Sequence, residues 1–310
     1  MQQITNSILM IRPRNPRANE QTAANNHFQN HTPIEDAEEK VQLEFDRYVK
    51  KLRAVGVNVI VYEQDDQLDT PDAHFPNNWL STHENGDIVL YPMYAKNRRL
   101  ERREGVLKLL ESSGFSIENI IDYSIAENES VYLEGTGSLV LDRQNKIAFC
   151  ALSDRSDEGL FIEFCEDFEY NPIVFTANQI VKGNRKPIYH TNVMMCIAET
   201  FAIVCLDSID NKKERKQVAT FLKSSGKEII KINEKQVTHF AGNMLQVVGR
   251  DEKRYLVMSE AAFNALTQSQ ISTIEKHCDI LYSAINTIEA YAGGSVRCLI
   301  TEVFLPQQGH

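Results

Sequence analysis

The sequence predicts an α/β fold made of five ββαβ-like units around a pseudo-fivefold axis, with the helices on the outside. Two observations support this prediction. Short polar or glycine-containing turns that precede apolar strands recur along the chain, and a similar order of strands and helices follows them. No Pro/Gly/Ser-rich linker divides the 310 residues, so residues 1–310 are expected to form a single domain.

The five turns recur at a nearly constant spacing. They occupy residues 75–80, 133–139, 190–194, 240–245 and 292–296. With Asn78, Gly137, Asn192, Asn243 and Ser295 taken as equivalent positions, the intervals are about 59, 55, 51 and 52 residues. Five units of this size account for nearly the whole chain.

The residue pattern assigns the elements of each unit in chain order. Tight turns at Asn85-Gly86-Asp87 and Arg143-Gln144-Asn145 lead into apolar strands at 88–91 and 146–149, which is typical of β-hairpins. Helices are expected at 98–113, 157–168, 211–225 and 259–277, followed by short strands such as 227–232. The strands at 7–12 and 297–305 lack hairpin partners, so pairing the two ends would close the ring.

Charge and hydropathy exclude several classes of partner. The formal net charge is -10, and no basic surface of the kind that binds nucleic acid is evident. The longest apolar stretches, such as residues 193–204, contain Glu199 and fall short of the ~20 apolar residues that a membrane span needs. The N-terminus has neither the basic segment nor the apolar core of a secretion signal.

The cysteines point to a reducing compartment. Cys150, Cys165, Cys196, Cys205, Cys278 and Cys298 show no CxxC pair, and most lie in apolar runs. We therefore expect free thiols in a cytoplasmic protein and no metal site. Gly135-Thr136-Gly137 lacks the third glycine of a dinucleotide-binding loop, and no GxxxxGK[ST] motif occurs, so no nucleotide cofactor is expected.

Residues able to do chemistry lie near the five turns, which would meet at one end of the axis. They are Asp72, Glu134, His190, His239 and Cys298. A thiol, an imidazole and a carboxylate suit nucleophilic catalysis. From the residues alone, Cys298 could equally be a core cysteine and His190 a hydrogen-bonded histidine at a strand entrance. Glu134 lies in an apolar run, where a carboxylate is costly unless it is paired.

Five motifs, taken together and in this order, resemble the guanidino-group-modifying superfamily. They are the segments 71–78, 97–101, 133–137, 190–192 and 293–298. This superfamily includes arginine deiminases, dimethylarginine hydrolases and amidinotransferases, and the chain most resembles its citrulline utilisation hydrolases. The resemblance implies the pentein fold, a five-bladed α/β propeller.

The resemblance also implies a role for each matching residue. Cys298 corresponds to the family nucleophile, His190 to the general acid/base and Glu134 to the carboxylate that orients the histidine. Asp72 and Asn78 fall at the two positions that hold the planar head group of the substrate, and Asn192 is also expected to bind the substrate. Arg155 resembles the family arginine that binds the substrate carboxylate. Either Arg98 or Arg99 is expected to assist it.

Two positions depart from the pattern of relatives that act on guanidinium. Asn78 and Asn192 stand where those relatives commonly carry Asp. A carboxylate matches a cationic guanidinium through charge-assisted hydrogen bonds, whereas an uncharged amide offers one donor and one acceptor group. The change favours a neutral ureido group, and therefore citrulline, although Asp72 remains.

We therefore predict a hydrolase that converts citrulline to ornithine, ammonia and carbon dioxide through an S-carbamoyl enzyme, without metal or organic cofactor. The alternatives are hydrolysis of arginine or a methylated arginine, amidino transfer to an amine, and a non-enzymatic pentein that only binds a ligand. The expected partner is a small ureido or guanidino amino acid, with no nucleic acid and no membrane. The sequence leaves open a homo-oligomer and the roles of His74 and His239.

Overall fold

The computed structural model describes residues 1–30, 32, 34–63 and 67–308. In this part of the chain, five sheets have three strands each. In chain order they are β3 (Leu80–Thr82), β4 (Asp87–Leu90) and β5 (Asn119–Asp122); β6 (Leu139–Asp142), β7 (Ile147–Ala151) and β8 (Asn171–Phe175); β11 (Met195–Ile197), β12 (Phe201–Val204) and β13 (Glu228–Lys231); β14 (Leu245–Val248), β15 (Arg254–Ser259) and β16 (Asp279–Ser283); and β17 (Thr301–Glu302), β1 (Ser7–Arg12) and β2 (Asn58–Glu63).

The five sheets share one pairing pattern. In each sheet the central strand pairs antiparallel with the first strand and parallel with the third. A parallel pair requires a crossover, and a helix lies in each crossover. These helices are α1 (Ala37–Ala54), α2 (Glu104–Ser112), α4 (Glu158–Asp167), α5 (Lys212–Ser224) and the pair α7 (Glu260–Ala265) and α8 (Gln268–Ile274). The predicted order of strand, strand, helix and strand is therefore confirmed.

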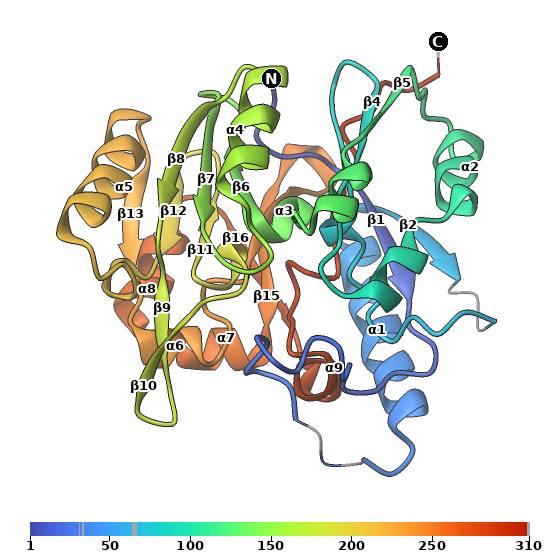
Figure 1. Cartoon of the computed structure of the whole chain (residues 1–310), viewed down its shortest axis with the longest axis horizontal. Coiled ribbons are helices and arrows are strands. Elements are labelled where there is room, and N and C mark those ends of the chain that lie inside the picture. Colours follow the sequence, from blue (N-terminus) through green and yellow to red (C-terminus); the bar gives the residue numbers. More distant parts are fainter. Residues whose placement is uncertain (31, 33, 64–66, 309–310) are drawn as a thin grey trace.

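The two ends of the chain pair as predicted. Ile8 and Leu9 of β1 are in antiparallel register with Glu302 and Thr301 of β17, so the fifth sheet combines both ends. The strand expected at 297–305 is shorter than predicted, because only Thr301–Glu302 is extended and paired. Figure 1 shows α2 and α5 at opposite outer edges of the molecule, while the short helix α3 (Gly135–Ser138) lies between the sheets.

The helix and strand prediction was incomplete in four places. The helix expected at 98–113 begins as a 3-10 segment, Lys96–Glu101, before α2. The helix expected at 259–277 is divided because Thr267 caps α8 through a capping box with Gln270. Helix α1, which precedes the first unit, and the hairpin of β9 (Asn178–Val181) and β10 (Asn184–Pro187) were not predicted.

The remaining helical elements are short. They are α6 (Glu234–Val237), α9 (Asn286–Ala292) and the 3-10 segments Pro76–Asn78, Ser124–Glu129, Thr191–Val193, Leu206–Ser208 and Arg250–Glu252. The largest apolar core spans the second, third and fourth sheets and includes Phe149, Phe201 and Met258. All six cysteines are buried and free.

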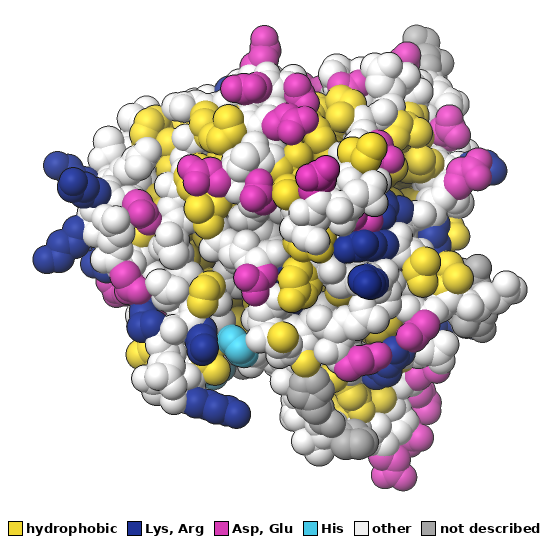
Figure 2. All heavy atoms as spheres, in the orientation of Figure 1, with side chains coloured by type: hydrophobic (Ala, Val, Ile, Leu, Met, Phe, Trp, Pro, Cys, Tyr) yellow, Lys and Arg dark blue, Asp and Glu magenta, His cyan; other side chains and the backbone are white. Residues whose placement is uncertain are grey.

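The surface and the helices add two observations. On the face seen in Figure 2, acidic and basic side chains are interspersed. No helix within the described residues is both long enough and apolar enough to cross a membrane.

Candidate active site

The five turns contact one another in sequence order. Hydrogen bonds link each of the first three turns to the next, and a further one links the fourth turn to Arg297, directly after the fifth. They are Thr136 Oγ1 to Asn77 O (3.4 Å), Asn192 Nδ2 to Thr136 O (3.2 Å), Asn243 Nδ2 to Asn192 O (3.0 Å) and the Arg297 backbone N to Asn243 Oδ1 (3.0 Å). Gly294 closes the circuit, since a Cβ there would lie 2.7 Å from the Phe75 ring of the first turn. Residues from five distant segments therefore meet in one place.

Glu134 and His190 form a buried hydrogen-bonded pair. The distance from His190 Nε2 to Glu134 Oε2 is 2.7 Å, and neither side chain is more than 2% exposed. Burial alone would raise the pKa of Glu134, but Arg155 and the hydrogen bond from His190 hold it at about 2. Burial lowers the pKa of His190 to about 4 in spite of Glu134. At neutral pH the Glu134 carboxylate therefore accepts a hydrogen bond from the Nε2–H of neutral His190, which leaves the Nδ1 lone pair available as a base.

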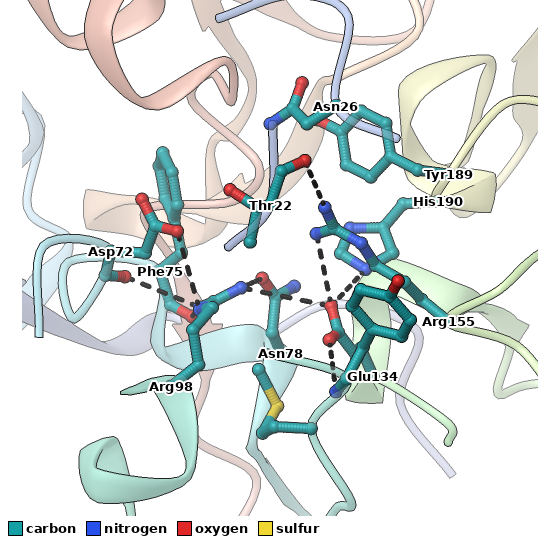
Figure 3. A network of polar contacts seen from close by, with 12 residues as sticks. Thr22, Asn26, Asp72, Phe75, Asn78, Arg98, Glu134, Arg155, Tyr189 and His190 are labelled. Atoms are coloured by element: carbon teal, nitrogen blue, oxygen red, sulfur yellow. Dashed lines mark hydrogen bonds and ion pairs between the residues drawn. The ribbon is translucent and has the colours of Figure 1, made fainter. Parts of the chain in front are cut away.

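Two arginines also face Glu134 (Figure 3). Arg155 Nη1 lies 3.5 Å from Glu134 Oε2, and its guanidinium lies over the Tyr189 ring at 4.8 Å. Arg98 Nη1 is 3.9 Å from the same oxygen. The second carboxylate oxygen accepts a hydrogen bond from the Tyr94 backbone N at 3.0 Å. These contacts compensate the charge of a carboxylate that is removed from water.

Arg98 fixes the orientation of Asn78. Its Nε and Nη2 donate to both carboxylate oxygens of Glu101 at 2.9 Å, and its Nη1 donates to Asn78 Oδ1 at 2.8 Å. A guanidinium can only donate, so the oxygen of the Asn78 amide must face it. The NH₂ group of Asn78 then points the other way, toward Asn77 Oδ1 at 3.2 Å and Gly137.

Asp72 presents an acceptor oxygen without a partner. Asn19 Nδ2 donates to Asp72 Oδ2 at 2.8 Å, while Oδ1 is buried and unpaired among the described residues. Burial raises the pKa of Asp72 above its ordinary value, against the opposing effects of Arg98 and Asn19. An unpaired buried acceptor is costly, and a ligand N–H would relieve that cost.

Cys298 is held between two side-chain amides. Its sulfur accepts from Asn243 Nδ2 at 3.3 Å and from Asn192 Nδ2 at 3.7 Å. Among the described residues these amides, and not the His190 ring, are its side-chain hydrogen-bond partners. Burial raises the pKa of the Cys298 thiol, while the backbone of Ser295, the Asn243 amide and Arg297 act in the opposite direction.

The segment 19–29 covers the site. Arg155 donates to Asn25 Oδ1 through both Nε and Nη2 and to the Thr22 carbonyl at 3.5 Å. Asn26 Nδ2 donates to the Ala292 carbonyl at 3.1 Å. With this segment in place, Asp72, Asn78, Arg155 and Cys298 are all at most 3% exposed.

Three of the residues named from the sequence lie apart from this cluster. Arg99 donates to the Met93 carbonyl and pairs with Glu127 at 3.4 Å. His239 is exposed and contacts the Lys235 carbonyl. His74 is buried beside Phe75, and its ring nitrogens have no hydrogen-bond partner among the described residues.

Sequence reasoning missed several residues of the site. Asn243 was identified as a repeat position but not as a partner of the thiol, although its equivalence to Asn78 and Asn192 is a signal that could have identified it. Asn19 and Asn25 lie before the first unit, where the repeat gives no guidance. Glu101 lies within the 97–101 motif and Tyr189 directly precedes the 190–192 motif, but neither was assigned a contact.

Comparisons with known proteins agree on a family and a fold. A family model described as N,N dimethylarginine dimethylhydrolase, eukaryotic, matches residues 12–305. No curated protein matches the chain. Apo ArgZ, an arginine dihydrolase from the ornithine–ammonia cycle in cyanobacteria, has a TM-score of 0.72 at 16% identity, with 97% of this chain and 41% of that chain covered.

Two further solved structures are similar. AgrE, as a cysteine-to-alanine variant with L-arginine, has a TM-score of 0.74 at 15% identity, covering 98% of this chain and 41% of that chain. A histidine-to-glycine variant of dimethylarginine dimethylaminohydrolase, as an adduct with S-methyl-L-thiocitrulline, has a TM-score of 0.63 at 13% identity, covering 96% and 98%. The chain therefore spans about two fifths of full-length ArgZ and AgrE.

Proposed function

Because the chain belongs to the N,N-dimethylarginine dimethylhydrolase family, within the guanidino-group-modifying superfamily, we propose that it is a cysteine-dependent hydrolase of a ureido or guanidino amino acid. We propose citrulline as the substrate and ornithine, ammonia and carbon dioxide as the products. We further infer that residues 1–310 are one domain in which the five sheets are the blades of a pentein propeller. The repeated pairing pattern and the circuit of contacts between the turns support this inference.

The substrate proposal rests on one observation: the site offers both a hydrogen-bond donor, the Asn78 NH₂ group, and an acceptor, Asp72 Oδ1. Arg98 fixes the Asn78 amide so that its NH₂ group is turned away from the guanidinium, and Asp72 Oδ1 is an unpaired acceptor. A ureido group has a carbonyl oxygen that needs a donor and N–H groups that need an acceptor. A guanidinium has only N–H groups and would leave one N–H of the Asn78 amide, the one not bonded to Asn77 Oδ1, without an acceptor. The geometry thus favours a neutral ureido group over a guanidinium.

In the proposed reaction, His190 Nδ1 accepts the proton of the Cys298 thiol, and the thiolate attacks the ureido carbon. The resulting imidazolium is paired with Glu134 through Nε2. It then gives its proton to the departing side-chain nitrogen, which releases ornithine and leaves an S-carbamoyl enzyme. Neutral His190 next deprotonates a water molecule that attacks this carbonyl carbon. Release of the Cys298 sulfur yields carbamate, which decomposes to ammonia and carbon dioxide.

We assign the binding of the substrate carboxylate to Arg155. Besides Glu134, Arg155 contacts the Asn25 oxygen and the Thr22 carbonyl, two neutral acceptors that a substrate carboxylate could replace with a stronger, charge-assisted contact. Arg98 is committed to Glu101 and Asn78, and we propose that it orients Asn78. Arg99 contacts Met93 and Glu127, which supports a structural role. Asn192 is proposed to act beside the sulfur, which it contacts at 3.7 Å.

Hydrolysis of a guanidino amino acid is the second candidate. The family assignment favours a methylated arginine, and the fold similarity to arginine dihydrolases favours arginine itself. Asp72 retains the carboxylate that a guanidinium would need. Amidino transfer and ligand binding without catalysis remain further alternatives, which the same experiment separates.

The test is to incubate the purified protein separately with citrulline, arginine, dimethylarginine and agmatine, and to measure ornithine, citrulline, methylamines and ammonia. We expect ornithine from citrulline, and loss of that activity in Cys298→Ala. The matched control is Cys165→Ala, which removes another buried free thiol, on α4, and should retain activity. Turnover of arginine or dimethylarginine without turnover of citrulline would overturn the substrate assignment. Retained activity in Cys298→Ala would overturn the mechanism.

A further inference from the structure

Asn243 occupies the fourth turn and directly contacts the Cys298 sulfur. Its Nδ2 donates to Sγ at 3.3 Å and to the Asn192 carbonyl at 3.0 Å, and its Oδ1 accepts from the Arg297 backbone N at 3.0 Å. The residue is 1% exposed. An amide has two N–H donors, and both are used here.

These contacts permit only one orientation of the amide. If it flipped, Oδ1 would face the Asn192 carbonyl oxygen, and the NH₂ group would face the Arg297 N–H. Both contacts would then join groups of the same polarity in a buried site, which is costly. The fold therefore holds an N–H of Asn243 against the sulfur of Cys298.

We propose that Asn243 is the positioning residue for Cys298, which stabilises its thiolate and holds the sulfur in place for attack. The proposal deepens the proposed function, since it takes Cys298 as the nucleophile. A donor that bonds to the charged form of a group favours that form. This matters because burial disfavours a thiolate.

Few other side chains around Cys298 can supply this stabilisation, which adds to that from the backbone of Ser295. Asn192 Nδ2 is closer to the Thr136 carbonyl, at 3.2 Å, than to the sulfur, at 3.7 Å. The charge of Arg297 favours the thiolate, but its guanidinium is engaged by Glu302 at 2.6 Å and by the Ile300 carbonyl. The hydroxyl of Tyr189 is directed to the Gly293 carbonyl at 2.6 Å. Asn243 is thus the nearest side-chain donor to the sulfur among these groups.

The test measures the thiolate directly, without substrate. The rate of alkylation of Cys298 by iodoacetamide is followed from pH 6 to 10, with the labelled peptide identified by mass spectrometry. We expect Asn243→Ala to move the midpoint to higher pH and to slow alkylation about five-fold at neutral pH. Asn243→Asp should move this midpoint to still higher pH, because a carboxylate oxygen would then face the sulfur and disfavour the thiolate. Asn243→Ser restores a small hydrogen-bond donor, so its alkylation midpoint should lie between those of Asn243→Ala and the parent protein.

Controls separate this role from a structural one. Asn264→Asp makes the same chemical change at an exposed position of α7 and should leave the profile unchanged. Unchanged midpoints in folded Asn243→Ala and Asn243→Ser would overturn the proposal. If Asn243→Ala is unfolded by circular dichroism, the profile of Asn243→Ser decides in its place. If the variants shift the alkylation profile but the protein turns over no ureido or guanidino compound, the role of Asn243 would be supported. Only the proposed function would then be overturned.

Discussion

One buried carboxylate, that of Glu134, is the common partner of His190, Arg155 and Arg98. Removing one member of such a group leaves the others with uncompensated charge, which costs more than the contact itself contributes. Glu134 therefore links the stability of the site to its proposed proton transfer.

Glu134→Gln is expected to lower both activity and stability. Glutamine keeps the size of the side chain but removes the charge that faces the two arginines and the imidazolium. We expect turnover to fall by about 10²-fold or more and the free energy of unfolding to fall by about 3 kcal/mol. Steady-state assays and urea unfolding measure the two effects. The control Glu127→Gln removes a partly exposed partner of Arg102 and should cost less while preserving turnover. Equal effects of the two variants would contradict this reading.

His74 should make stability dependent on pH. Burial, with a further contribution from Arg98, lowers its pKa from 6.5 to about 3. Between these values the unfolded chain binds more protons than the folded one, so stability is complete above pH 6.5 and is lost as the pH falls. In His74→Leu the loss of unfolding free energy between pH 7 and 4.5 should be smaller by roughly 2 kcal/mol. Urea unfolding at the two pH values measures this difference. If His74→Leu lost as much unfolding free energy as the parent protein, the pH dependence could not be assigned to His74.

The sequence could identify those site residues whose own side chain has the required chemistry. Cys298, His190 and Glu134 stand next to recognisable turns, and the structure brings all three into the buried cluster. The orientation of Asn78 was not predictable, because it depends on Arg98, twenty residues later, and on Glu101 beyond it. Asn243 was missed because an asparagine in a turn is common, and only its contact with sulfur distinguishes it.

At the scale of elements, α3 determines how closely the first three turns can approach. A Cβ on Gly137 would lie 2.6 Å from Asn78 Nδ2 and 2.8 Å from His190 Nδ1. Glycine is required here for space, since it lets Asn78 and His190 share one surface of the helix. The Gly135-Thr136-Gly137 sequence thus serves packing between units.

Gly137→Ala is therefore expected to reduce turnover by at least about tenfold, while destabilising the fold by about 1–3 kcal/mol. The added methyl group must push Asn78 or His190 out of position. The comparison is Gly159→Ala on α4, where the nearest neighbour of the new Cβ is a side-chain oxygen of Asp157 at 3.2 Å. That variant should retain turnover. Full activity in Gly137→Ala would show that the two residues can separate without consequence. Activity assays with thermal unfolding check both variants.

The element boundaries were predictable where local signals are strong and were wrong where packing decides. Hairpin turns such as that at Asn85-Gly86-Asp87 lead into the expected strands. Helix α1 buries Val41, Phe45, Tyr48 and Leu52, but it lies before the first turn, so the repeat does not predict it. The 3-10 start of the predicted helix at residue 98 follows from the contacts of Arg98, which a periodic pattern does not contain.

For the whole molecule, a site made of five distant turns should be lost only when the fold is lost. Trp79, the one tryptophan in the sequence, is fully buried and follows Asn78 directly. We expect its fluorescence to shift to the red at the same urea concentration at which activity disappears, because the core around Trp79 and the site should unfold in one cooperative transition. Activity lost well before the fluorescence change would contradict this cooperativity. The pairing of the chain ends and the meeting of the five turns are the long-range contacts that the repeat predicts.

The cover formed by residues 19–29 has a consequence for timing. Asp72 and Arg155 are buried beneath Asn19, Thr22 and Asn25, so a ligand reaches them only after those hydrogen bonds break. Association should then include a first-order opening step. In stopped-flow experiments, the observed binding rate would level off at high ligand concentration instead of rising in proportion to it.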